Sequence, residues 1–368
     1  MKKNVLIISG SRADFGLLEP IIFSLKKSNK FETLLLLTGM HTLKQYGYTV
    51  DDIKSRGYKI SKIVPISKNG DMLSWFSEEI EGIYNFCSRN TVDLILVLGD
   101  RDEMLAGAIV GAHLGIPVGH VHGGDLSGES VVDSKNRNAI TQFSTFYFAA
   151  TKKSAKRISK MIQSDKNIYI VGAPGVDLIK NIKIKSRDEI AREFNLDQHK
   201  KWVLVLMHPT PLSKGLTFRE QITPVCNSLA DSSFEIIWIY PNSDTGSDIF
   251  IEEIDVFAKN KKIKLFKNLL RENFVTFLSV VDVLVGNSSA GIIESAYFHL
   301  PVVNVGDRQS GRERSANVID CGYNKIEIVE AMTKAVSVEF RIVAKKSKSV
   351  YGNGFAGEKI AEILEKKL

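Results

Sequence analysis

Short apolar runs alternate with stretches of helical periodicity along almost the whole chain of 368 residues. The runs are rich in β-branched side chains and nearly free of charge, which is typical of strands buried on both faces of a parallel sheet. They lie at about residues 4–9, 33–38, 93–98, 116–121, 145–149 and 168–171, and again at about 202–207, 234–240, 263–266, 281–285 and 301–305. Strands that alternate with helices in this way predict an α/β protein with parallel sheets.

The two series of strands indicate two domains. The chain is longer than one hydrophobic core usually covers, and residues 173–200, rich in Lys, Asp and Asn, separate the two series. We therefore expect a Rossmann-like domain over residues 1–172 and a second over residues 173–350. A last helix, within residues 351–368, is expected to pack back on the first domain. Two such domains should face a cleft that binds the ligand.

Composition narrows the class of protein. Hydrophobic residues make up 44% of the chain and charged residues 25%, as in soluble globular proteins. The net charge is +7, but the basic residues are scattered, so we expect no nucleic-acid partner. The three cysteines lie far apart without metal-ligand spacing, which favours a cytoplasmic location and no metal. The N-terminus predicts a first strand instead of a signal peptide, and no apolar run approaches the roughly 20 residues of a membrane span.

A candidate anion site follows the strand at 281–285. The sequence Gly-Asn-Ser-Ser favours a turn and a helix N-cap. Ser288 and Ser289 are thus expected where a strand ends and a helix begins, and two hydroxyls beside free backbone N–H groups suit a diphosphate. Glu294, about one turn further on, would repel phosphate and suits the hydroxyl pair of a ribose or sugar. The alternative is a capped helix that binds no ligand.

The first strand leads into a loop of small residues, 9–16, that carries Arg12 and Asp14. Arg12 can hold a phosphate with two hydrogen bonds. The loop fits neither G-x-G-x-x-G nor a Walker A motif, which argues against a nicotinamide cofactor and against P-loop chemistry. The alternative is a tight turn in which the Arg and the Asp form a surface pair.

Acids and histidines follow two further strands of the first half. Asp100 begins a run of four charged residues at a strand exit. Charges at the end of a buried strand cost free energy unless water or a ligand solvates them, so Asp100 is a candidate general base or hydroxyl ligand. His122 lies beside two glycines and is a candidate for acid–base work, whereas His120 is expected in the core. Two histidines alone argue only weakly for a metal. Asp133 and Arg137 extend this polar loop.

The second half places cations and hydrogen-bonding groups at its strand exits. His208 stands in a segment stiffened by proline and can contact phosphate, and Asn242 is a natural partner for hydroxyls. Arg308, Arg312 and Arg314 surround a glycine and predict a flexible anion clamp, unless the loop is simply charged and solvated. The second domain therefore gathers residues that suit a nucleotide diphosphate site. The first domain gathers residues that suit a proton-transfer site for a sugar.

These segments, in order and spacing from about residue 4 to 366, resemble the UDP-N-acetylglucosamine 2-epimerases, especially the hydrolysing branch of sialic and legionaminic acid biosynthesis. The matching segments are Ser-Arg-Ala-Asp-Phe-Gly (11–16), Gly-Asp-Arg (99–101), His-Val-His-Gly-Gly-Asp (120–125), His-Pro (208–209), Pro-Asn (241–242), Gly-Asn-Ser-Ser-Ala-Gly-Ile-Ile-Glu (286–294) and Gly-Asp-Arg-Gln-Ser-Gly-Arg-Glu (306–313). The resemblance implies the glycosyltransferase-B fold, no metal or other cofactor, and a homodimer or homotetramer.

The resemblance also assigns residues one by one. It places UDP on Arg12, His208, Ser288, Ser289, Glu294 and Arg308, with Asn242 as a further contact. It places acid–base chemistry on Asp100, His122 and Asp133. His208 joins the catalytic candidates, and Asp14, Arg101 and Arg312 join the substrate-binding ones.

One segment departs from the pattern of the family. Hydrolysing members read Asp-Asp-Ser, one residue, then Arg-His-Ala-Ile-Thr-Lys, whereas residues 132–142 contain one additional residue and carry Asn138 and Gln142 in place of His and Lys. Because this segment lies near the sugar in the family, the departure bears on the identity of the sugar and on the role of Asp133.

The resemblance implies a hydrolysing UDP-N-acetylglucosamine 2-epimerase. Such an enzyme removes the C2 proton while UDP leaves C1, in an anti elimination, and hydrates the resulting 2-acetamidoglucal to free N-acetylmannosamine for nonulosonic acid synthesis. One alternative is the same reaction on UDP-2,4-diacetamido-2,4,6-trideoxyglucose, for legionaminic acid, or on a GDP-linked sugar. Others are the non-hydrolysing epimerase, a glycosyltransferase of the same fold, and a sensor that binds UDP-sugar without turnover.

Overall fold

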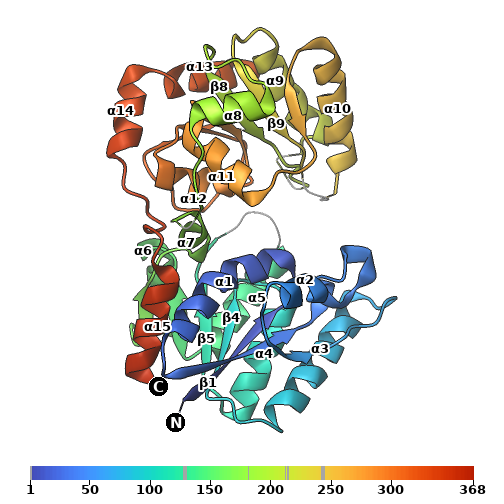
Figure 1. The fold of residues 1–368 in the computed structure, drawn as a ribbon, viewed down its shortest axis with the longest axis vertical. Coiled ribbons are helices and arrows are strands. Elements are labelled where there is room, and N and C mark those ends of the chain that lie inside the picture. The colour runs from blue at the N-terminus through green and yellow to red at the C-terminus, as the bar shows by residue number, and fades with distance from the viewer. Residues whose placement is uncertain (1, 127–130, 181, 212, 214, 242–244) are drawn as a thin grey trace. The chain divides into compact units, whose positions relative to one another are not determined.

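The computed structural model describes residues 2–126, 131–180, 182–211, 213, 215–241 and 245–368, so Asn242 lies outside the described residues. The chain forms two compact units. The first contains the described residues up to 178 together with 351–368, and the second contains those of 179–350. Each unit is built on a parallel sheet (Figure 1). The predicted α/β class with two parallel-sheet domains is confirmed.

The first sheet has the strand order β3-β2-β1-β4-β5-β6-β7, and every neighbouring pair is parallel. Its strands are β1 (Lys3–Ser9), β2 (Phe31–Leu37), β3 (Ile60–Ile63), β4 (Leu94–Leu98), β5 (Val118–Val121), β6 (Phe146–Ala149) and β7 (Ile168–Ile170). The exits of β1, β4 and β5 are therefore neighbours, which brings the loops at residues 9–16, 99–103 and 122–126 to one edge of the sheet.

Helices cover both faces of the first sheet. They are α1 (Arg12–Lys27), η1 (Gly39–Thr42), η2 (Lys44–Tyr46), α2 (Val50–Ser55), α3 (Met72–Cys87), α4 (Asp102–Leu114), α5 (Val131–Phe143), α6 (Lys152–Ile162), α7 (Pro174–Lys180) and α15 (Ala356–Lys367). Successive side chains of a strand point to opposite faces. Val5 and Ile7 of β1 accordingly join the core formed with α1 and α15, and Leu6 and Ile8 join the core formed with α3 and α4.

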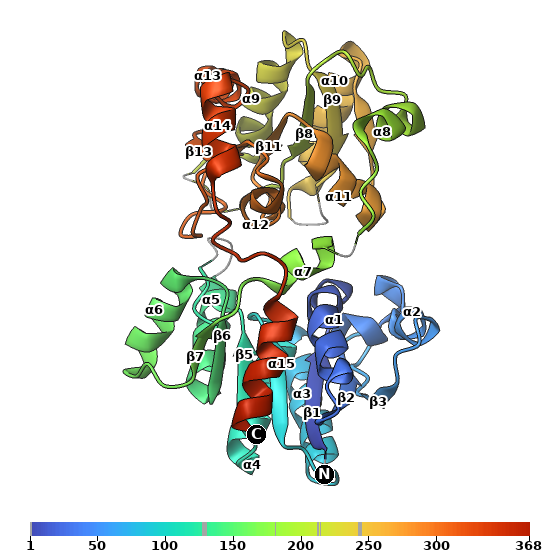
Figure 2. The same cartoon turned by 60° about the vertical axis from the view of Figure 1, so that its left-hand side comes forward.

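The last helix, α15, belongs to the first unit although 172 residues of the second unit precede it. It lies beside α1 (Figure 2), and its Ile360 and Leu364 are fully buried in the core they share. The carboxylate of Asp177 accepts hydrogen bonds from the backbone N–H groups of Ala356 and Gly357, at 2.9 and 2.7 Å. A carboxylate at this end of a helix satisfies unpaired donors and complements the helix dipole, so Asp177 fixes where α15 begins.

The second sheet has the order β10-β9-β8-β11-β12-β13, again parallel between neighbours. Its strands are β8 (Trp202–Leu206), β9 (Glu235–Ile239), β10 (Lys264–Phe266), β11 (Val283–Gly286), β12 (Val302–Val305) and β13 (Val318–Cys321). Its helices are α8 (Arg187–Phe194), α9 (Phe218–Ala230), α10 (Ser247–Asn260), α11 (Arg271–Val280), α12 (Ala290–Ile293), η3 (Ser295–Phe298), α13 (Lys325–Ala335) and α14 (Val338–Lys346). Because β8, β11 and β12 are adjacent, the loops after them bring together the candidate UDP-binding residues His208, Ser288, Ser289 and Arg308.

Two strands of the structure lack the expected apolar pattern. β3 and β13 are edge strands whose residues are only partly buried, and both carry polar side chains. The helix expected from residue 290 also differs, because α12 has four residues and continues as the 3-10 helix η3. Within the described residues, no helix has the length and apolar character needed to cross a membrane.

Candidate active site

At the exits of β4 and β5, one arginine holds the polar side chains together. Arg137, from α5, forms an ion pair with Asp100 and donates a hydrogen bond of 2.8 Å to the carbonyl oxygen of Asp125. The Arg137 side chain is almost buried, so its charge requires such partners. The structure thereby places Asp100, at the end of β4, against the loop that follows β5.

His122 is paired with a carboxylate that sequence reasoning did not select. Its Nδ1 lies 2.8 Å from Oδ2 of Asp125, and Ser154 donates to the other carboxylate oxygen at 2.6 Å. Burial alone would raise the pKa of Asp125, but the hydrogen bonds from His122 and Ser154 and the charge of Arg137 outweigh burial and lower it to about 2. An ionised Asp125 favours the His122 tautomer with the proton on Nδ1, which leaves Nε2 as the reactive nitrogen. Asp125 stands within the matched segment 120–125, three residues after His122. That position could have identified it from the sequence as a partner of His122.

The two histidines of this segment do not point the same way, as two residues of one strand would. β5 ends at Val121, and His122 has a left-handed backbone with φ of 63°. His120 is fully buried, with Nε2 2.8 Å from the Gly99 carbonyl oxygen and Nδ1 3.1 Å from the Thr141 hydroxyl. It is the core histidine expected of the pair. Among the described residues, no group of three or more His, Cys, Asp or Glu side chains is placed to hold a metal ion.

Asp133 lies in the first turn of α5 and is half-buried. Burial raises its pKa, and the negative charge of nearby Asp100 raises it further. The structure therefore brings Asp100, His122 and Asp133 to the same edge of the first sheet. Arg137 forms an ion pair with Asp100, and its positive charge also acts on Asp133, where it opposes the rise in pKa.

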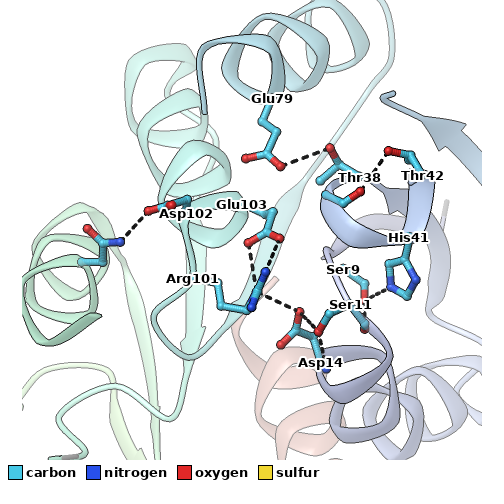
Figure 3. Close-up of polar contacts among 12 residues, drawn as sticks. Ser9, Ser11, Asp14, Thr38, His41, Thr42, Glu79, Arg101, Asp102 and Glu103 are labelled. Atoms are coloured by element: carbon cyan, nitrogen blue, oxygen red, sulfur yellow. Dashed lines mark hydrogen bonds and ion pairs between the residues drawn. The ribbon is translucent and has the colours of Figure 1, made fainter. Parts of the chain in front are cut away.

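A second polar cluster links the exits of β1, β2 and β4 (Figure 3). Arg101 holds Glu103 through two hydrogen bonds of 2.9 and 3.2 Å, and it lies 3.6 Å from Asp14. Asp14 also accepts a hydrogen bond of 2.8 Å from the Ser11 hydroxyl. Burial raises the pKa of Asp14 to about 6, although the charge of Arg101 opposes this. Asp14 thus faces inward to Arg101 and does not form a surface pair with Arg12, which is exposed at the start of α1.

Glu79 and His41 complete this cluster, and sequence reasoning missed both. Glu79, from α3, is 2% exposed and accepts a hydrogen bond of 3.4 Å from the Thr38 hydroxyl. Burial raises the pKa of Glu79 to about 9, and the charges of Glu103 and Asp102 contribute. His41 is fully buried between the hydroxyls of Ser9 and Thr49, and burial lowers its pKa to about 4. His41 follows the exit of β2 in η1, and that position was the available signal for it, whereas Glu79 lies within α3, away from any strand exit.

In the second unit, Asn287 organises the loops that carry the candidate UDP-binding residues. It is fully buried; its side-chain oxygen accepts from the His208 N–H at 2.7 Å, and its amide nitrogen donates to the His208 carbonyl at 2.8 Å. Its own carbonyl accepts from Gln309 at 2.9 Å and from Arg308 at 3.4 Å. The preceding Gly286 has φ of 147°, and a Cβ there would lie 1.9 Å from the Leu206 carbonyl oxygen. Only glycine therefore permits this junction.

The side chains around Asn287 include cations, hydroxyls and one acid. Burial lowers the pKa of His208 to about 4, and the charge of Arg308 adds to the effect, so His208 is neutral at pH 7. Ser288 and Ser289 are partly buried at the exit of β11, and Ser289 is the N-cap residue of α12. Glu294 forms an ion pair with Arg271 of α11. This set can hold an anion beside hydroxyl groups.

In the arginine loop after β12, the structure ties one of the three arginines to the loop and to β13. Arg314 pairs with Asp320 at 2.9 Å and donates to the carbonyl oxygens of Arg312 and Gln309, at 2.7 and 3.1 Å. These bonds commit the Arg314 side chain to protein partners. Arg308 and Arg312, both partly buried, remain the candidates for contact with an anion.

Solved structures define the class of fold to which this chain belongs. The crystal structure of the UDP-N-acetylglucosamine 2-epimerase from Neisseria meningitidis, bound to UDP-N-acetylglucosamine, is similar with a TM-score of 0.83 at 18% identity. The similarity covers 99% of this chain and all of that chain. The chain thus has the two-domain glycosyltransferase-B fold of these epimerases.

Sequence comparison gives the family. The model of the UDP-N-acetylglucosamine 2-epimerase family matches residues 24–365, and the chain belongs to that family. It is 36% identical to UDP-N,N'-diacetylbacillosamine 2-epimerase (hydrolyzing) from Legionella pneumophila, over 99% of this chain and 96% of that protein. It is 31% identical to a UDP-N-acetylglucosamine 2-epimerase from Neisseria meningitidis, over 91% of this chain and 88% of that protein. The resemblance found in the sequence motifs is confirmed.

Proposed function

We propose that the protein is a hydrolysing 2-epimerase that acts on a UDP-linked 2-acetamido sugar. The observation that carries this proposal is the cluster at the exits of β4 and β5. There Arg137 and Asp125 hold Asp100 and His122 in fixed positions, with Asp133 nearby. Carboxylates and a histidine at one edge of a sheet suit proton removal and proton return, which a sensor that only binds does not need.

The proposed reaction has two steps. In the first, a base takes the C2 proton, the C–H electron pair forms the C1–C2 double bond, and UDP leaves C1 with the electron pair of the C1–O bond. In the second, water adds across that double bond, with hydroxyl to C1 and a proton to C2 from the opposite face. Asp100, His122 and Asp133 are the candidates for the two proton transfers, without assignment of faces.

The second unit holds the leaving group in this proposal. Ser288, Ser289 and Arg308 hold the diphosphate, neutral His208 donates a hydrogen bond to it, and Glu294 accepts from the ribose hydroxyls. A C2–H beside an acetamido carbon is a weak acid, so the elimination depends on stabilising the negative charge that develops on the UDP oxygen. Arg12, Arg312 and Asn242 are proposed as further contacts to the nucleotide sugar. Asp14 then acts through Arg101, whose guanidinium it helps to orient.

Two sugars are candidates for the substrate. The relative named as a UDP-N,N'-diacetylbacillosamine epimerase supports UDP-2,4-diacetamido-2,4,6-trideoxyglucose, which leads to legionaminic acid. The relatives named as a polysialic acid biosynthesis protein and as a UDP-N-acetylglucosamine epimerase support UDP-N-acetylglucosamine, which gives N-acetylmannosamine. We further propose a cytoplasmic homodimer or homotetramer. Free thiols at Cys87, Cys226 and Cys321 are consistent with a reducing compartment.

Proton NMR of the reaction in deuterium oxide tests the proposed function. The expected result is free UDP, a free sugar with inverted C2, and deuterium at C2. A UDP-linked epimer in equilibrium with the substrate, without free UDP, would instead identify a non-hydrolysing epimerase. Binding of UDP-sugar without any turnover would identify a sensor.

A further inference from the structure

Glu294 places a negative charge beside the proposed diphosphate site. Its backbone N–H donates to the Ala290 carbonyl at 3.0 Å, and the Ala290 N–H donates to the Ser288 hydroxyl at 3.4 Å. Glu294 therefore lies one helical turn beyond the serine pair, directly after α12. Its side chain is only 12% exposed, so water and salt screen its repulsion of a bound diphosphate weakly.

A cation from a different element meets this carboxylate. Arg271, the first residue of α11, forms an ion pair with Glu294 through Nη2 and Oε1. The two elements are in contact, because α11 packs against η3, which follows Glu294. The guanidinium also lies 5.8 Å from the ring centroid of Phe274, one turn along α11, and this contact helps to fix the direction of the arginine side chain.

The position of Arg271 is unfavourable for the helix to which it belongs. A positive charge in the first turn opposes the helix dipole. Leu270, the N-cap residue, gives no side-chain hydrogen bond to the free N–H groups of that turn. The stability of α11 therefore does not account for an arginine at this place, whereas the pair with Glu294 does.

The pair leaves hydrogen-bonding capacity on both partners. In the described part of the chain, Oε2 of Glu294 and the Nε and Nη1 atoms of Arg271 have no partner. A pair that only joined α11 to η3 would be stronger with two parallel hydrogen bonds, which a guanidinium can give to a carboxylate. The one-sided geometry keeps one oxygen of Glu294 available as an acceptor for ligand hydroxyls.

We propose that Arg271 is a positioning residue for the nucleotide: it cancels the charge of Glu294 beside the diphosphate and holds the carboxylate so that Oε2 accepts from the ribose. This inference rests on the proposed function and adds a residue to its nucleotide site. Without Arg271, Glu294 would act on the bound phosphates as an uncompensated negative charge. The loss of affinity should therefore grow with the charge of the ligand and shrink with salt, which a merely structural role would not produce.

Calorimetric titration of the full chain with UDP, at low salt and at about 1 M NaCl, tests the inference. We expect Arg271→Gln to lower UDP affinity about ten-fold at low salt, within the range for coupled side chains in contact, and by a smaller factor at high salt. Affinity for uridine, which has no phosphate, is measured by competition with UDP and should fall less. Arg271→Lys keeps the charge and should retain most of the UDP affinity.

Arg341→Gln is the matched control. The Arg341 side chain is 49% exposed and pairs at 3.2 Å with Asp282, which is 11% exposed, so the pair resembles that of Arg271 and Glu294, at 40% and 12%. Asp282 directly precedes β11, at the end of that strand opposite to the serine pair. UDP affinity of Arg341→Gln should therefore equal that of the wild type.

A double variant tests the compensation of charge. Glu294→Gln removes the charge and keeps an amide oxygen as an acceptor for the ribose. With both substitutions, Arg271→Gln and Glu294→Gln, this place has no net charge, as in the wild type, so the double variant should bind UDP more tightly than Arg271→Gln alone. A double variant that binds UDP no more tightly would show that the Glu294 charge does not oppose binding, and would overturn the inference.

The outcomes separate this inference from the proposed function. A wild type that does not bind UDP overturns the proposed nucleotide site, and the inference with it. A wild type that binds UDP while Arg271→Gln behaves like Arg341→Gln overturns the inference alone. The same holds if Arg271→Gln lowers the affinities for UDP and uridine by the same factor at both salt concentrations, because Arg271 would then contact the nucleoside instead of cancelling a charge beside the phosphates.

Discussion

At the scale of single residues, Asp100 is the carboxylate with the most direct link to the proposed chemistry. Asp100→Asn removes the charge while an amide oxygen can still accept from Arg137. We expect turnover to fall about 10²-fold or more with little change in UDP affinity, as for the loss of a general base. Steady-state kinetics together with calorimetric titration of UDP would measure both. Asp93→Asn is the matched control, since Asp93 stands at the opposite end of β4, paired with Lys3, and should leave turnover unchanged.

Asp14 gives a prediction about stability and pH. Its pKa is about 6 in the folded protein and 3.8 in the reference state, so folding favours its neutral form. Neutral Asp14 therefore contributes to the free energy of unfolding below about pH 4, and this contribution is lost as the pH rises through about 6. The Asn of Asp14→Asn does not titrate, so at pH 7 the variant should have a free energy of unfolding higher than that of the wild type by roughly 1–3 kcal/mol. At pH 4 the two proteins should be equally stable.

Urea denaturation at the two pH values measures this difference. Asp71→Asn is a suitable control, because Asp71 is an exposed N-cap residue whose hydrogen bond lowers its pKa, so its loss should not stabilise the protein at pH 7. If Asp14→Asn is less stable than the wild type at both pH values, Asp14 is ionised and its ion pair with Arg101 dominates.

At the scale of elements, the sequence predicted the central strands well because they are buried on both faces and read as continuous apolar runs. The edge strands β3 and β13 read Ile-Ser-Lys-Ile and Val-Ile-Asp-Cys, and a half-exposed strand of four residues does not differ in pattern from a loop. The same limit applies to sites. Residues directly after buried strands could be selected, but Glu79, in the middle of α3, reaches its cluster only through tertiary packing.

The junction of β11 with the following loop makes the second unit sensitive to Asn287. Asn287→Ala would leave the N–H and the carbonyl of His208 without their partner, in a region closed to water. We expect a loss of about 2–6 kcal/mol in unfolding free energy, from two buried groups at about 1–3 kcal/mol each. UDP affinity should also fall, since the Asn287 side chain holds the backbone of His208, a proposed contact of the diphosphate.

Thermal or urea denaturation and titration with UDP test this prediction. Asn260→Ala is the control, because Asn260 makes its hydrogen bond to Val256 at the exposed end of α10. A stable Asn287→Ala variant with normal UDP affinity would show that Asn287 does not organise these loops.

At the scale of the whole molecule, the order of segments along the chain has a consequence for stability. The first unit is completed only by α15, the last segment of the chain, which covers α1 and contributes Ile360 and Leu364 to the core. Gly357 lies so close to α1 that a Cβ would be 2.6 Å from the Pro20 carbonyl oxygen, so the two helices are in close backbone contact. Stability of the first unit therefore depends on residues that follow the entire second unit.

Leu364→Ala tests this dependence in the full chain. Leu364 is fully buried against α1, and removing such a side chain costs about 2–5 kcal/mol through lost burial and the cavity left behind. The exposed Glu362, two residues earlier on α15, gives the control Glu362→Ala. Amide hydrogen exchange followed by peptide mapping should show faster exchange in β1, α1 and α15 of Leu364→Ala. Protection of β8 and β11 should stay unchanged, because their core contains no residue of α15. Equal loss of protection in both units would mean that they unfold together, and that α15 supports the whole chain instead of the first unit.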